Sequence, residues 1–337
     1  VQVVFNGEIF NYLELRRELE TRGHRFYTTS DTEVLVHLYE DFGERFVEHL
    51  NGQFAIALWD APARRLILAR DRVGIRPLFY AWSQQRLLFG SEAKAILAEG
   101  SLAPRLDTQS LIETCSYWCP LEGRSAFSDI HALPPGHLMV IEGTHSRITR
   151  YWDWDFGTVE SSAASNQNQI EELRALLEDA VRLQLRSDVP VGTYLSGGLD
   201  SSAITSMTQK ITNQPVRAFS LTFEDAEFDE GHFQRLMGNA LQVERTEYCC
   251  TRSDIAASFA HAVHHIEAPI VRTAPIPLML LARQVRESGY KVVLTGEGAD
   301  EVFAGYDLFR EAKIRRWVAR NPDSEWRGRL LERLYPY

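Results

Sequence analysis

From Val1 to about Phe156 the chain alternates short apolar runs with turn residues. The runs read VQVVF, FAIALWD, RLILARD, PLFYAW, RLLFGS and HLMVIEG. Short apolar runs bounded by turn residues are typical of β-strands. Two segments instead show helical spacing of their apolar residues, NYLELRRELETRG ending at Gly23 and TEVLVHLYEDFG ending at Gly43. The pattern therefore predicts an α+β domain with mostly antiparallel strands over residues 1–156.

The pattern changes after that domain. Residues 157–169 read GTVESSAASNQNQ, with almost no large apolar residue, which predicts a linker. Over residues 170–337 helices alternate with apolar strands, beginning IEELRALLEDAVRLQLRS, VPVGTYL and DSSAITSMTQKI. This alternation predicts a doubly wound α/β domain with a parallel sheet. Ligands of such sheets bind beyond the carboxyl ends of the strands.

Composition narrows the class of protein. The 337 residues are 45% apolar and 24% charged, as in ordinary globular proteins of two domains. The net charge of −10 argues against a nucleic-acid partner, and an amphipathic helix with one basic face accounts for the stretch KIRRWVARN. No run approaches the roughly 18 apolar residues of a membrane span, and a signal-peptide pattern is missing, so we expect a cytoplasmic protein without a membrane partner. The sequence leaves a homodimer open.

The four cysteines and the clustered histidines give no metal signal. Four cysteines at these spacings fit neither a disulfide framework nor a paired zinc site. The segment HAVHH places His261, His264 and His265 at helical spacing, but no carboxylate or cysteine at a matching spacing completes a site. We therefore assign neither group to a metal.

A heptad of glycines, hydroxyls and one acid follows the strand VPVGTYL and leads into a helix. Its residues are Ser196, Gly197, Gly198, Leu199, Asp200, Ser201 and Ser202. Glycines permit positive φ and a close anion, and the N–H groups at a helix start favour negative charge. Because the lysine of the mononucleotide P-loop is missing, we predict a pyrophosphate site, with magnesium bridging Asp200 to phosphate. A serine-capped turn without a ligand is the alternative.

A second cluster, KVVLTGEGADEVFAGYD, again follows an apolar strand and brings three carboxylates together. Glu297, at the strand end, is placed to accept a proton from an attacking amine. Asp300, one helical step further on, is placed to share the cation with Asp200. An acidic helix N-terminus favoured by the helix dipole is the alternative, and it suits Glu301 best.

These motifs resemble a known family. The heptad matches the pyrophosphate loop S-G-G-x-D-S of the ATP pyrophosphatases, and with TGEGADEVFAGY it resembles the glutamine-hydrolysing asparagine synthetases. The segments FNGEIFNYLELRRELE, TSDTEV, LNGQFAIALWD and RDRVGIRPLFY resemble the glutaminase domain of class II amidotransferases. The resemblance covers nearly the whole chain. It implies an N-terminal-nucleophile sandwich (αββα) over residues 1–156 and a synthetase domain of the ATP-pyrophosphatase type over 170–337.

The function implied is a ligase that makes asparagine from aspartate, glutamine and ATP through β-aspartyl-AMP, releasing AMP, pyrophosphate and glutamate. By position in the family motifs, Asn6 and Gly7 would form the oxyanion hole for glutamine's γ-carbonyl. Glu8 and Asp31 would hold its α-amino group.

In the second domain the resemblance assigns ATP contacts to the heptad and to four further residues, namely Tyr194, Leu221, Thr295 and Gly296. It assigns magnesium to Asp200 and Asp300, and the proton-accepting role to Glu297.

The chain also departs from the family pattern. The family's nucleophile is a cysteine at the mature N-terminus. This chain has Val1 at its first position, and none of its four cysteines sits where that nucleophile would be. The arginine that binds the glutamine carboxylate and a lysine for the adenylated intermediate are not found either. We therefore expect a fragment lacking both termini that does not itself hydrolyse glutamine.

Two rival functions stay open. β-Lactam synthetases and peptide cyclases share the second domain with another acceptor, but the acids Glu8 and Asp31 argue for a glutamine pocket. A catalytically silent scaffold is disfavoured by the complete ATP motifs. Of the remaining charged residues, we expect Arg72 and Arg76 to pair with Asp71 and neighbouring acids rather than contact substrate, and leave open whether Arg272 orients the carboxylate of aspartate.

Overall fold

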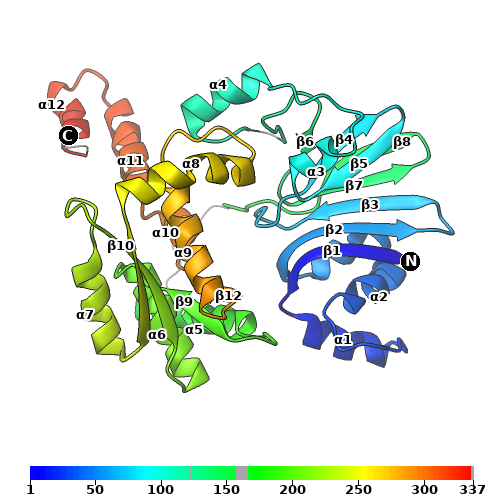
Figure 1. The fold of residues 1–337 in the computed structure, drawn as a ribbon, viewed down its shortest axis with the longest axis horizontal. Coiled ribbons are helices and arrows are strands. Elements are labelled where there is room, and N and C mark those ends of the chain that lie inside the picture. Colours follow the sequence, from blue (N-terminus) through cyan, green and yellow to red (C-terminus); the bar gives the residue numbers. More distant parts are fainter. Residues whose placement is uncertain (122, 157–165, 335–337) are drawn as a thin grey trace. The chain divides into compact units, whose positions relative to one another are not determined.

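The computed structural model describes residues 1–121, 123–156 and 166–334 (Figure 1). The chain forms two compact units, Val1–Arg186 with Arg252–Met279, and Ser187–Thr251 with Leu280–Tyr337. Of the expected linker, residues 157–165 lie outside the described part of the chain. The helix α5 (Asn166–Gln184) includes its last four residues.

The first unit begins with strands and short helices in the order that the apolar pattern indicates. They are β1 (Gln2–Ile9), α1 (Tyr12–Thr21), α2 (Glu33–Phe42), the 3-10 helix η1 (Gly43–His49), β2 (Gly52–Asp60), β3 (Arg65–Arg70), β4 (Phe79–Ser83), β5 (Arg86–Gly90), α3 (Ala93–Leu97), α4 (Thr108–Tyr117), β6 (His131–Ala132), β7 (His137–Glu142) and β8 (His145–Arg150). The unit also holds α5 and α8 (Arg252–Ile266).

The strand pairs described in this unit are antiparallel, in agreement with the mostly antiparallel strands predicted for residues 1–156. One sheet has the order β1-β2-β3-β7-β8 and the other the order β5-β4-β6. The two predicted helices are present, and glycines with positive φ follow them, Gly23 at 101° and Gly43 at 56°. Positive φ is readily available only to glycine, so these residues end the helices as the sequence indicates.

Alternation along the strands builds the predicted four layers. In β2, Phe54, Ile56 and Leu58 pack with the leucines of α1 and α2. Between them, Ala55 and Ala57 point to the opposite face and pack against Leu78, Leu133 and the partly buried Tyr80 and Leu87 of the second sheet. The far face of the second sheet packs on α3 through Ala81, Ala93 and Ile96. Both faces of β2 are thus covered, which explains its continuous apolar run. Figure 1 shows α1 and α2 beside β1 and β2.

The turn after β3 is organised by a buried carboxylate. Asp71 is only 1% exposed and accepts hydrogen bonds from the backbone N–H groups of Phe54, Val73, Ile75 and Arg76, at 2.9 to 3.2 Å. The expected pairing of Asp71 with the guanidinium of Arg76 is therefore wrong. A buried carboxylate needs hydrogen-bond donors for both of its oxygens, and here several backbone N–H groups supply them.

The guanidinium of Arg70 also binds the backbone of this turn. It donates to the carbonyl oxygens of Arg76, Leu133 and Gly74 at 2.8 to 2.9 Å. Burial lowers the pKa of Arg70, with the nearby Asp71 carboxylate opposing that shift. The segment RDRVGIRPL is thus held by an acid and a base that bind backbone groups.

Residues 252–279 join the first unit through a capped helix. The side chain of Glu267 accepts the backbone N–H groups of Ala93 (2.6 Å) and Lys94 (2.7 Å), which begin α3. Helix-start N–H groups lack partners within the helix, so a carboxylate there satisfies two of them. This contact helps explain why the unit does not end near residue 156.

The second unit contains the predicted parallel sheet. Its elements are β9 (Val191–Tyr194), α6 (Leu199–Thr212), β10 (Arg217–Phe223), α7 (Gly231–Leu241), β11 (Glu244–Cys250), the later part of α9 (Pro275–Glu287), β12 (Val292–Leu294), α10 (Ala299–Phe303), α11 (Asp307–Ala319), α12 (Glu325–Gly328) and the 3-10 helix η2 (Leu331–Arg333). The strand order is β11-β10-β9-β12, and each neighbouring pair is parallel.

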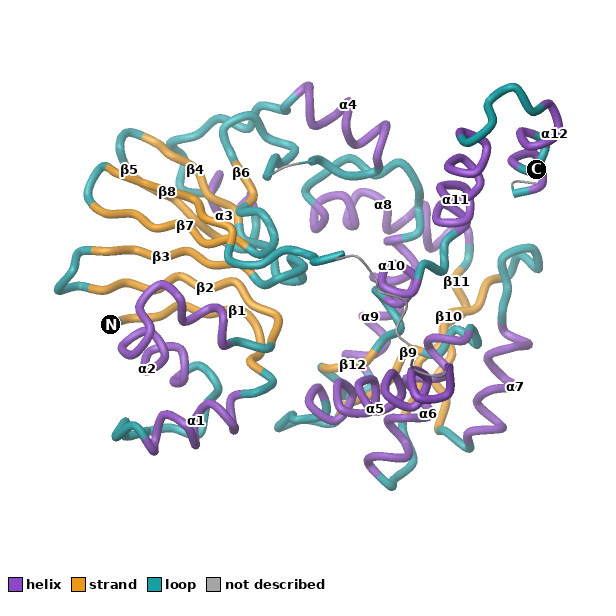
Figure 2. Tube along the Cα trace, turned by 180° about the vertical axis from the view of Figure 1, so that it is seen from behind, coloured by secondary structure: helices purple, strands orange, loops and turns teal. Residues whose placement is uncertain are grey.

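Helices cover both faces of this sheet, as a doubly wound fold requires. On one face Phe219 packs with Leu281 and Val285 of α9. On the other, the Thr205 hydroxyl of α6 donates to the hydroxyl of Thr193 at 3.1 Å. Figure 2 shows the four strands with α6 and α7 alongside. The order places β9 and β12 next to each other, so their carboxyl ends share one edge.

The buried carboxylate of Asp71 gives a test of the first unit. In Asp71→Asn one acceptor oxygen becomes an N–H₂ group that faces backbone donors. We expect the free energy of unfolding to fall by about 3 kcal/mol, measured by urea denaturation. The control is Asp153→Asn, whose side chain is 55% exposed and pairs with Arg150. It should change stability by less than about 1 kcal/mol. Equal effects of the two substitutions would contradict this account of the turn.

Candidate functional site

The glycine- and serine-rich heptad forms the turn between β9 and α6. Its hydroxyls bind one another and the backbone: Ser196 Oγ lies 2.9 Å from Ser201 Oγ, and the N–H of Gly198 donates to Ser196 Oγ at 3.3 Å. Gly198 directly precedes the first residue of α6. The start of this helix, with its N–H groups and positive dipole end, therefore lies within the heptad, as predicted.

Gly197 is required for the shape of this turn. Its φ is 84°, and a Cβ added there would lie 2.7 Å from the backbone nitrogen of Gln234 and 2.8 Å from the Cβ of Phe233. Both neighbours belong to α7. A side chain at Gly197 would therefore meet a strained backbone and a helix at once.

One hydroxyl of the heptad has no partner. Ser202 is 8% exposed, and its Oγ has no hydrogen-bond partner among the described residues. A buried hydroxyl without a partner is uncommon because its desolvation is not offset. Phosphate oxygens accept hydrogen bonds. The hydroxyls of Ser196, Ser201 and Ser202 can donate them.

The second acidic motif lies against the heptad. A Cβ added to Gly296, just after β12, would lie 2.8 Å from the Cβ of Asp200 and 3.0 Å from the backbone nitrogen of Ser201. The strand ends of β9 and β12 therefore bring the two motifs into direct contact. Sequence alone places them nearly one hundred residues apart. The absence of a side chain at Gly296 permits this approach.

Asp300 lies on the short helix α10 and is fixed by a glycine that the sequence analysis did not assign. A Cβ added to Gly305 would lie 1.8 Å from Asp300 Oδ1, and the N–H of Gly305 donates to the Asp300 carbonyl at 2.9 Å. Asp300 thus follows the strand next to the one that precedes Asp200. Two carboxylates at one sheet edge are hard oxygen ligands of the kind Mg²⁺ prefers, so these residues fit that ion.

Glu297 and Glu301 have different surroundings. Glu297 is exposed, and its N–H donates to Thr295 Oγ1 at 3.4 Å. Glu301 accepts the hydroxyl of Tyr306 at 2.8 Å, and this hydrogen bond raises the pKa of Tyr306. The exposed carboxylate of Glu297 is the one available to accept a proton at the strand end.

Tyr194 and Leu221 lie in the sheet rather than in the turn. Both pack, partly buried, on the face with Phe219, and burial raises the pKa of Tyr194. The carbonyl of Leu221 accepts the Gln234 side chain at 2.8 Å. Leu199 is 85% exposed. The predicted ATP contacts of these three residues stay predictions.

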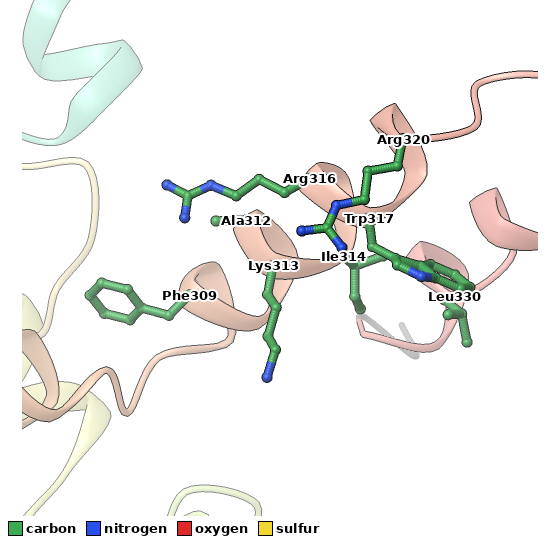
Figure 3. A pocket seen from close by; sticks show the side chains of 8 residues that line it. All are labelled: Phe309, Ala312, Lys313, Ile314, Arg316, Trp317, Arg320 and Leu330. Carbon is green, nitrogen blue, oxygen red and sulfur yellow. The ribbon is translucent and has the colours of Figure 1, made fainter. Parts of the chain in front are cut away.

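A basic hollow of about 750 Å³ lies along α11, away from these motifs in the sequence (Figure 3). Its lining residues are Phe309, Ala312, Lys313, Ile314, Arg316, Trp317, Arg320 and Leu330. Figure 3 shows Trp317 turned toward Leu330, with the three cations spread along the helix. The lining contains no carboxylate and no glycine turn, so it does not resemble a magnesium–nucleotide site. The stretch KIRRWVARN begins within α11, which ends at Ala319, so most of it is helical; that it presents one basic face stays a prediction.

The predicted glutamine-binding residues gather on β1. Residues of β1 alternate, with Val3, Phe5 and Ile9 packed in the core and Asn6 and Glu8 exposed on the other face. Asn6 Nδ2 donates to Ser91 Oγ at 3.1 Å, which leaves its second N–H available. Ser91 follows β5 and was not assigned from the sequence.

Asp31 reaches the same strand from the loop before α2. Its Oδ2 accepts the N–H of Ile9 at 2.9 Å, so its carboxylate lies beside the residue that follows Glu8. Ser30 and Thr32 donate their hydroxyls to its other oxygen, each at 3.3 Å. Three of the predicted glutamine ligands therefore lie along β1, and the fourth, Asp31, is bound to its backbone.

Gly7 is fixed by the neighbouring strand. A Cβ there would lie 2.0 Å from the carbonyl oxygen of Gln53 and 2.8 Å from the Cα of Phe54, both in β2. No L side chain fits this space, so glycine is required at the centre of the motif NGE.

Two further charged side chains, those of Arg272 and Asp229, have defined partners. The guanidinium of Arg272 lies over the ring of Trp118, 4.4 Å from its centroid, which is a cation–π contact. Asp229 accepts the backbone N–H groups of Phe223 and Gly231, both at 3.2 Å, and so links the end of β10 to the start of α7. All four cysteines are free thiols, three of them exposed and Cys250 buried.

Family models match both halves of the chain. Residues 1–152 match the glutamine amidotransferase domain, and residues 172–336 match asparagine synthase. The chain belongs to the asparagine synthetase family. The predicted resemblance is thereby confirmed, and the antiparallel and parallel sheets agree broadly with its two domains.

Curated relatives agree with this assignment. Asparagine synthetase [glutamine-hydrolyzing] 3 of Bacillus subtilis is 35% identical over 98% of this chain and 55% of its own length. Asparagine synthetase [glutamine-hydrolyzing] 1 of the same organism is 33% identical over 92% of the chain and 48% of its own length. The amidase chyE of Penicillium rubens is 34% identical over 97% and 49%. The chain thus spans about half the length of these relatives. None of the helices described here has the length and apolarity needed to cross a bilayer.

The contact between Gly296 and Asp200 can be tested by substitution. Gly296→Ala places a methyl group within 2.8 Å of the Asp200 Cβ and must displace the turn. We expect a loss of about 1–3 kcal/mol in unfolding free energy and faster amide exchange at Ser201 and Ser202. The control is Gly328→Ala, where a Cβ meets nothing within 4 Å. It should leave both quantities unchanged or raise stability by up to about 1 kcal/mol. Unchanged exchange in Gly296→Ala would refute the contact.

Proposed function

We propose that the protein carrying this chain synthesises asparagine from aspartate, glutamine and ATP, through β-aspartyl-AMP. The observation that supports this most is the contact of Gly296 with Asp200, which joins the heptad to the acidic motif at one sheet edge. Membership of the asparagine synthetase family does not by itself specify the reaction that the protein catalyses. A phosphate turn with two carboxylates and an exposed third one at the adjoining strand end suits adenylation followed by attack of an amine.

The heptad is proposed to hold the pyrophosphate part of ATP. The N–H groups at the start of α6 face the phosphate oxygens, and Ser196, Ser201 and Ser202 donate their hydroxyls. The β-carboxylate of aspartate attacks the α-phosphorus, the bond to the β,γ-pyrophosphate breaks, and pyrophosphate leaves. Thr295 and Gly296 line the same edge and contact the nucleotide, as do Tyr194 and Leu221 in this proposal.

Asp200 and Asp300 are proposed to hold Mg²⁺ between them. When bound there, the ion would supply positive charge to offset the negative charge of the leaving pyrophosphate. Without a cation, Asp200 beside phosphate would be repulsive.

Glu297 is proposed as the proton acceptor of the second step. Ammonia attacks the acyl carbon of β-aspartyl-AMP, AMP leaves with the electrons of the acyl–oxygen bond, and the surplus ammonium proton passes to the Glu297 carboxylate. Its exposure and its position at the end of β12 allow it to meet an incoming amine.

The first unit is proposed to bind glutamine as the source of ammonia. Asn6 Nδ2 has one N–H left after its bond to Ser91, and with the Gly7 N–H it forms the oxyanion hole. The carboxylates of Glu8 and Asp31 attract the α-ammonium group of glutamine. Glutamate is the second product of this half-reaction.

A second candidate differs only in the acceptor. The second candidate is an enzyme that forms an amide from an acid other than aspartate. It is supported by the similarity to the amidase chyE of Penicillium rubens, which is 34% identical over 97% of the chain. The same adenylation site would serve it. The identity of the acid that supports pyrophosphate exchange distinguishes the two candidates.

Exchange of labelled pyrophosphate into ATP tests the adenylation step in the full-length protein. We expect exchange that requires both aspartate and Mg²⁺. Asp200→Asn and Asp300→Asn should each lower its rate about 100-fold or more, because each removes half of the charge that holds the cation. The matched control is Asp307→Asn, an exposed residue on α11 paired with Arg310.

The outcomes of this exchange assay are distinct. Exchange driven by another carboxylic acid and not by aspartate selects the second candidate. No exchange with any acid, despite a folded protein, selects a silent scaffold and refutes the proposal.

The glutamine pocket is tested by Asn6→Asp in the full-length protein. The substitution replaces an oxyanion donor with a carboxylate and should lower glutamine-dependent synthesis about 100- to 1000-fold. Synthesis from added ammonia should be unaffected, since it bypasses the pocket. The control Val4→Thr changes an exposed residue on the same face of β1. Equal loss with both nitrogen sources would contradict the assignment of Asn6.

A further inference from the structure

Two histidines and a glutamate converge at the connection between α1 and α2. His24 follows Gly23 after α1, while His37 and Glu40 lie three residues apart on one face of α2. Among the described residues, these three form a group whose ligand atoms all lie within 4.8 Å of one another. The side chains of His24 and His37 are 16% and 13% exposed, and that of Glu40 is 45% exposed. The group is therefore recessed but reachable from solvent.

The spacing of the three ligand atoms matches that of metal ligands. His24 Nδ1 lies 3.1 Å from His37 Nδ1 and 3.4 Å from Glu40 Oε2, and His37 Nδ1 lies 2.8 Å from Glu40 Oε2. Tetrahedral zinc with bonds of about 2.0–2.1 Å sets its ligand atoms about 3.3–3.4 Å apart. The three atoms thus already lie close to the positions of one face of such a tetrahedron. We propose that His24, His37 and Glu40 bind a divalent transition metal ion, with zinc as the best-fitting occupant.

The outer hydrogen bond of His24 supports this reading. Its Nε2 lies 2.8 Å from Asp41 Oδ1, so that nitrogen carries the proton and donates it. In the neutral ring Nδ1 then has a lone pair, and this lone pair faces the cluster. A carboxylate behind a ligating histidine is the usual arrangement in metal sites, where it fixes the tautomer and the ring orientation.

The surroundings of His37 point the same way. Its Nδ1 faces both the lone pair of His24 and the carboxylate of Glu40, while its Nε2 is buried without a hydrogen-bond partner among the described residues. The nearest acid to Nε2 is Glu33, whose Oε1 lies 3.8 Å away. A proton on Nε2 suits that carboxylate, and it leaves Nδ1 as a second lone pair directed at the cluster. A cation satisfies both lone pairs and Glu40 at once.

The donor set selects the kind of ion. Two imidazole nitrogens and one carboxylate oxygen suit zinc, cobalt or nickel and not magnesium or calcium, which prefer oxygen ligands. Three protein ligands leave a fourth position for water. A bound ion would join the start of the α1–α2 connection to α2. The same connection leads to Asp31, which binds the Ile9 N–H.

Metal titration of the full chain tests the site. After chelator treatment, Zn²⁺ is added in calorimetry and Co²⁺ in visible spectroscopy, both in excess Mg²⁺ so that oxygen-only sites are occupied. We expect one tight equivalent of Zn²⁺ and the intense visible bands of tetrahedral Co²⁺. Glu40→Gln should weaken binding at least 10-fold, and Asp41→Asn, which touches only the outer nitrogen of His24, should weaken it 10- to 100-fold.

The matched control is Glu20→Gln, which removes another half-exposed helix carboxylate, one that pairs with Arg16. It should bind both ions like the parent. Because the side chain of Glu40 is 45% exposed, Glu40→Gln should unfold at the parent's temperature in the presence of chelator. A parent that binds no Zn²⁺ contains only a histidine–carboxylate ion-pair cluster, and the proposal is wrong. Equal binding by the parent, Glu40→Gln and Asp41→Asn places the ion elsewhere and overturns it as well.

Discussion

The close approach of Gly296 to Asp200 is the constraint on which the proposed synthetase site depends. Two parallel strands, β9 and β12, are neighbours in the sheet, and the segments after them can meet only if one of them lacks a side chain at the crossing point. The glycine supplies that space. Because of this contact, an acid after one strand and an acid after the next come to share an edge. Two carboxylates at one edge favour a divalent cation, so we expect such an ion there on physical grounds.

A comparable constraint shapes the first unit. Gly7 lies so close to β2 that no side chain fits, and the alternation of β1 then puts Asn6 and Glu8 on the exposed face. Asp71 fixes the turn between the two sheets through backbone N–H groups. In both units, therefore, the proposed functional groups lie on strands or in segments beside the strand ends, and glycine contacts and a buried acid fix these segments.

The sequence was enough to predict the broad fold and to name the candidate site residues, because both depend on local patterns. Apolar runs of period two predicted the antiparallel sheets, and strand–helix alternation predicted the parallel one. It could not find features that depend on approach in space. The acceptor role of Asp71, the packing of Gly305 on Asp300 and the orphaned Ser202 hydroxyl all require coordinates. The histidine cluster was missed for the same reason, since His24 meets His37 only because the chain turns back at Gly23.

The most direct test is a crystal structure of the protein with a non-hydrolysable ATP analogue and Mn²⁺ in place of Mg²⁺. We expect an anomalous peak bonded to oxygens of both Asp200 and Asp300, with the β- and γ-phosphates on the N-terminus of α6. A nucleotide bound elsewhere, such as along α11, would contradict the proposed site. So would a metal ion that contacts only one of the two aspartates.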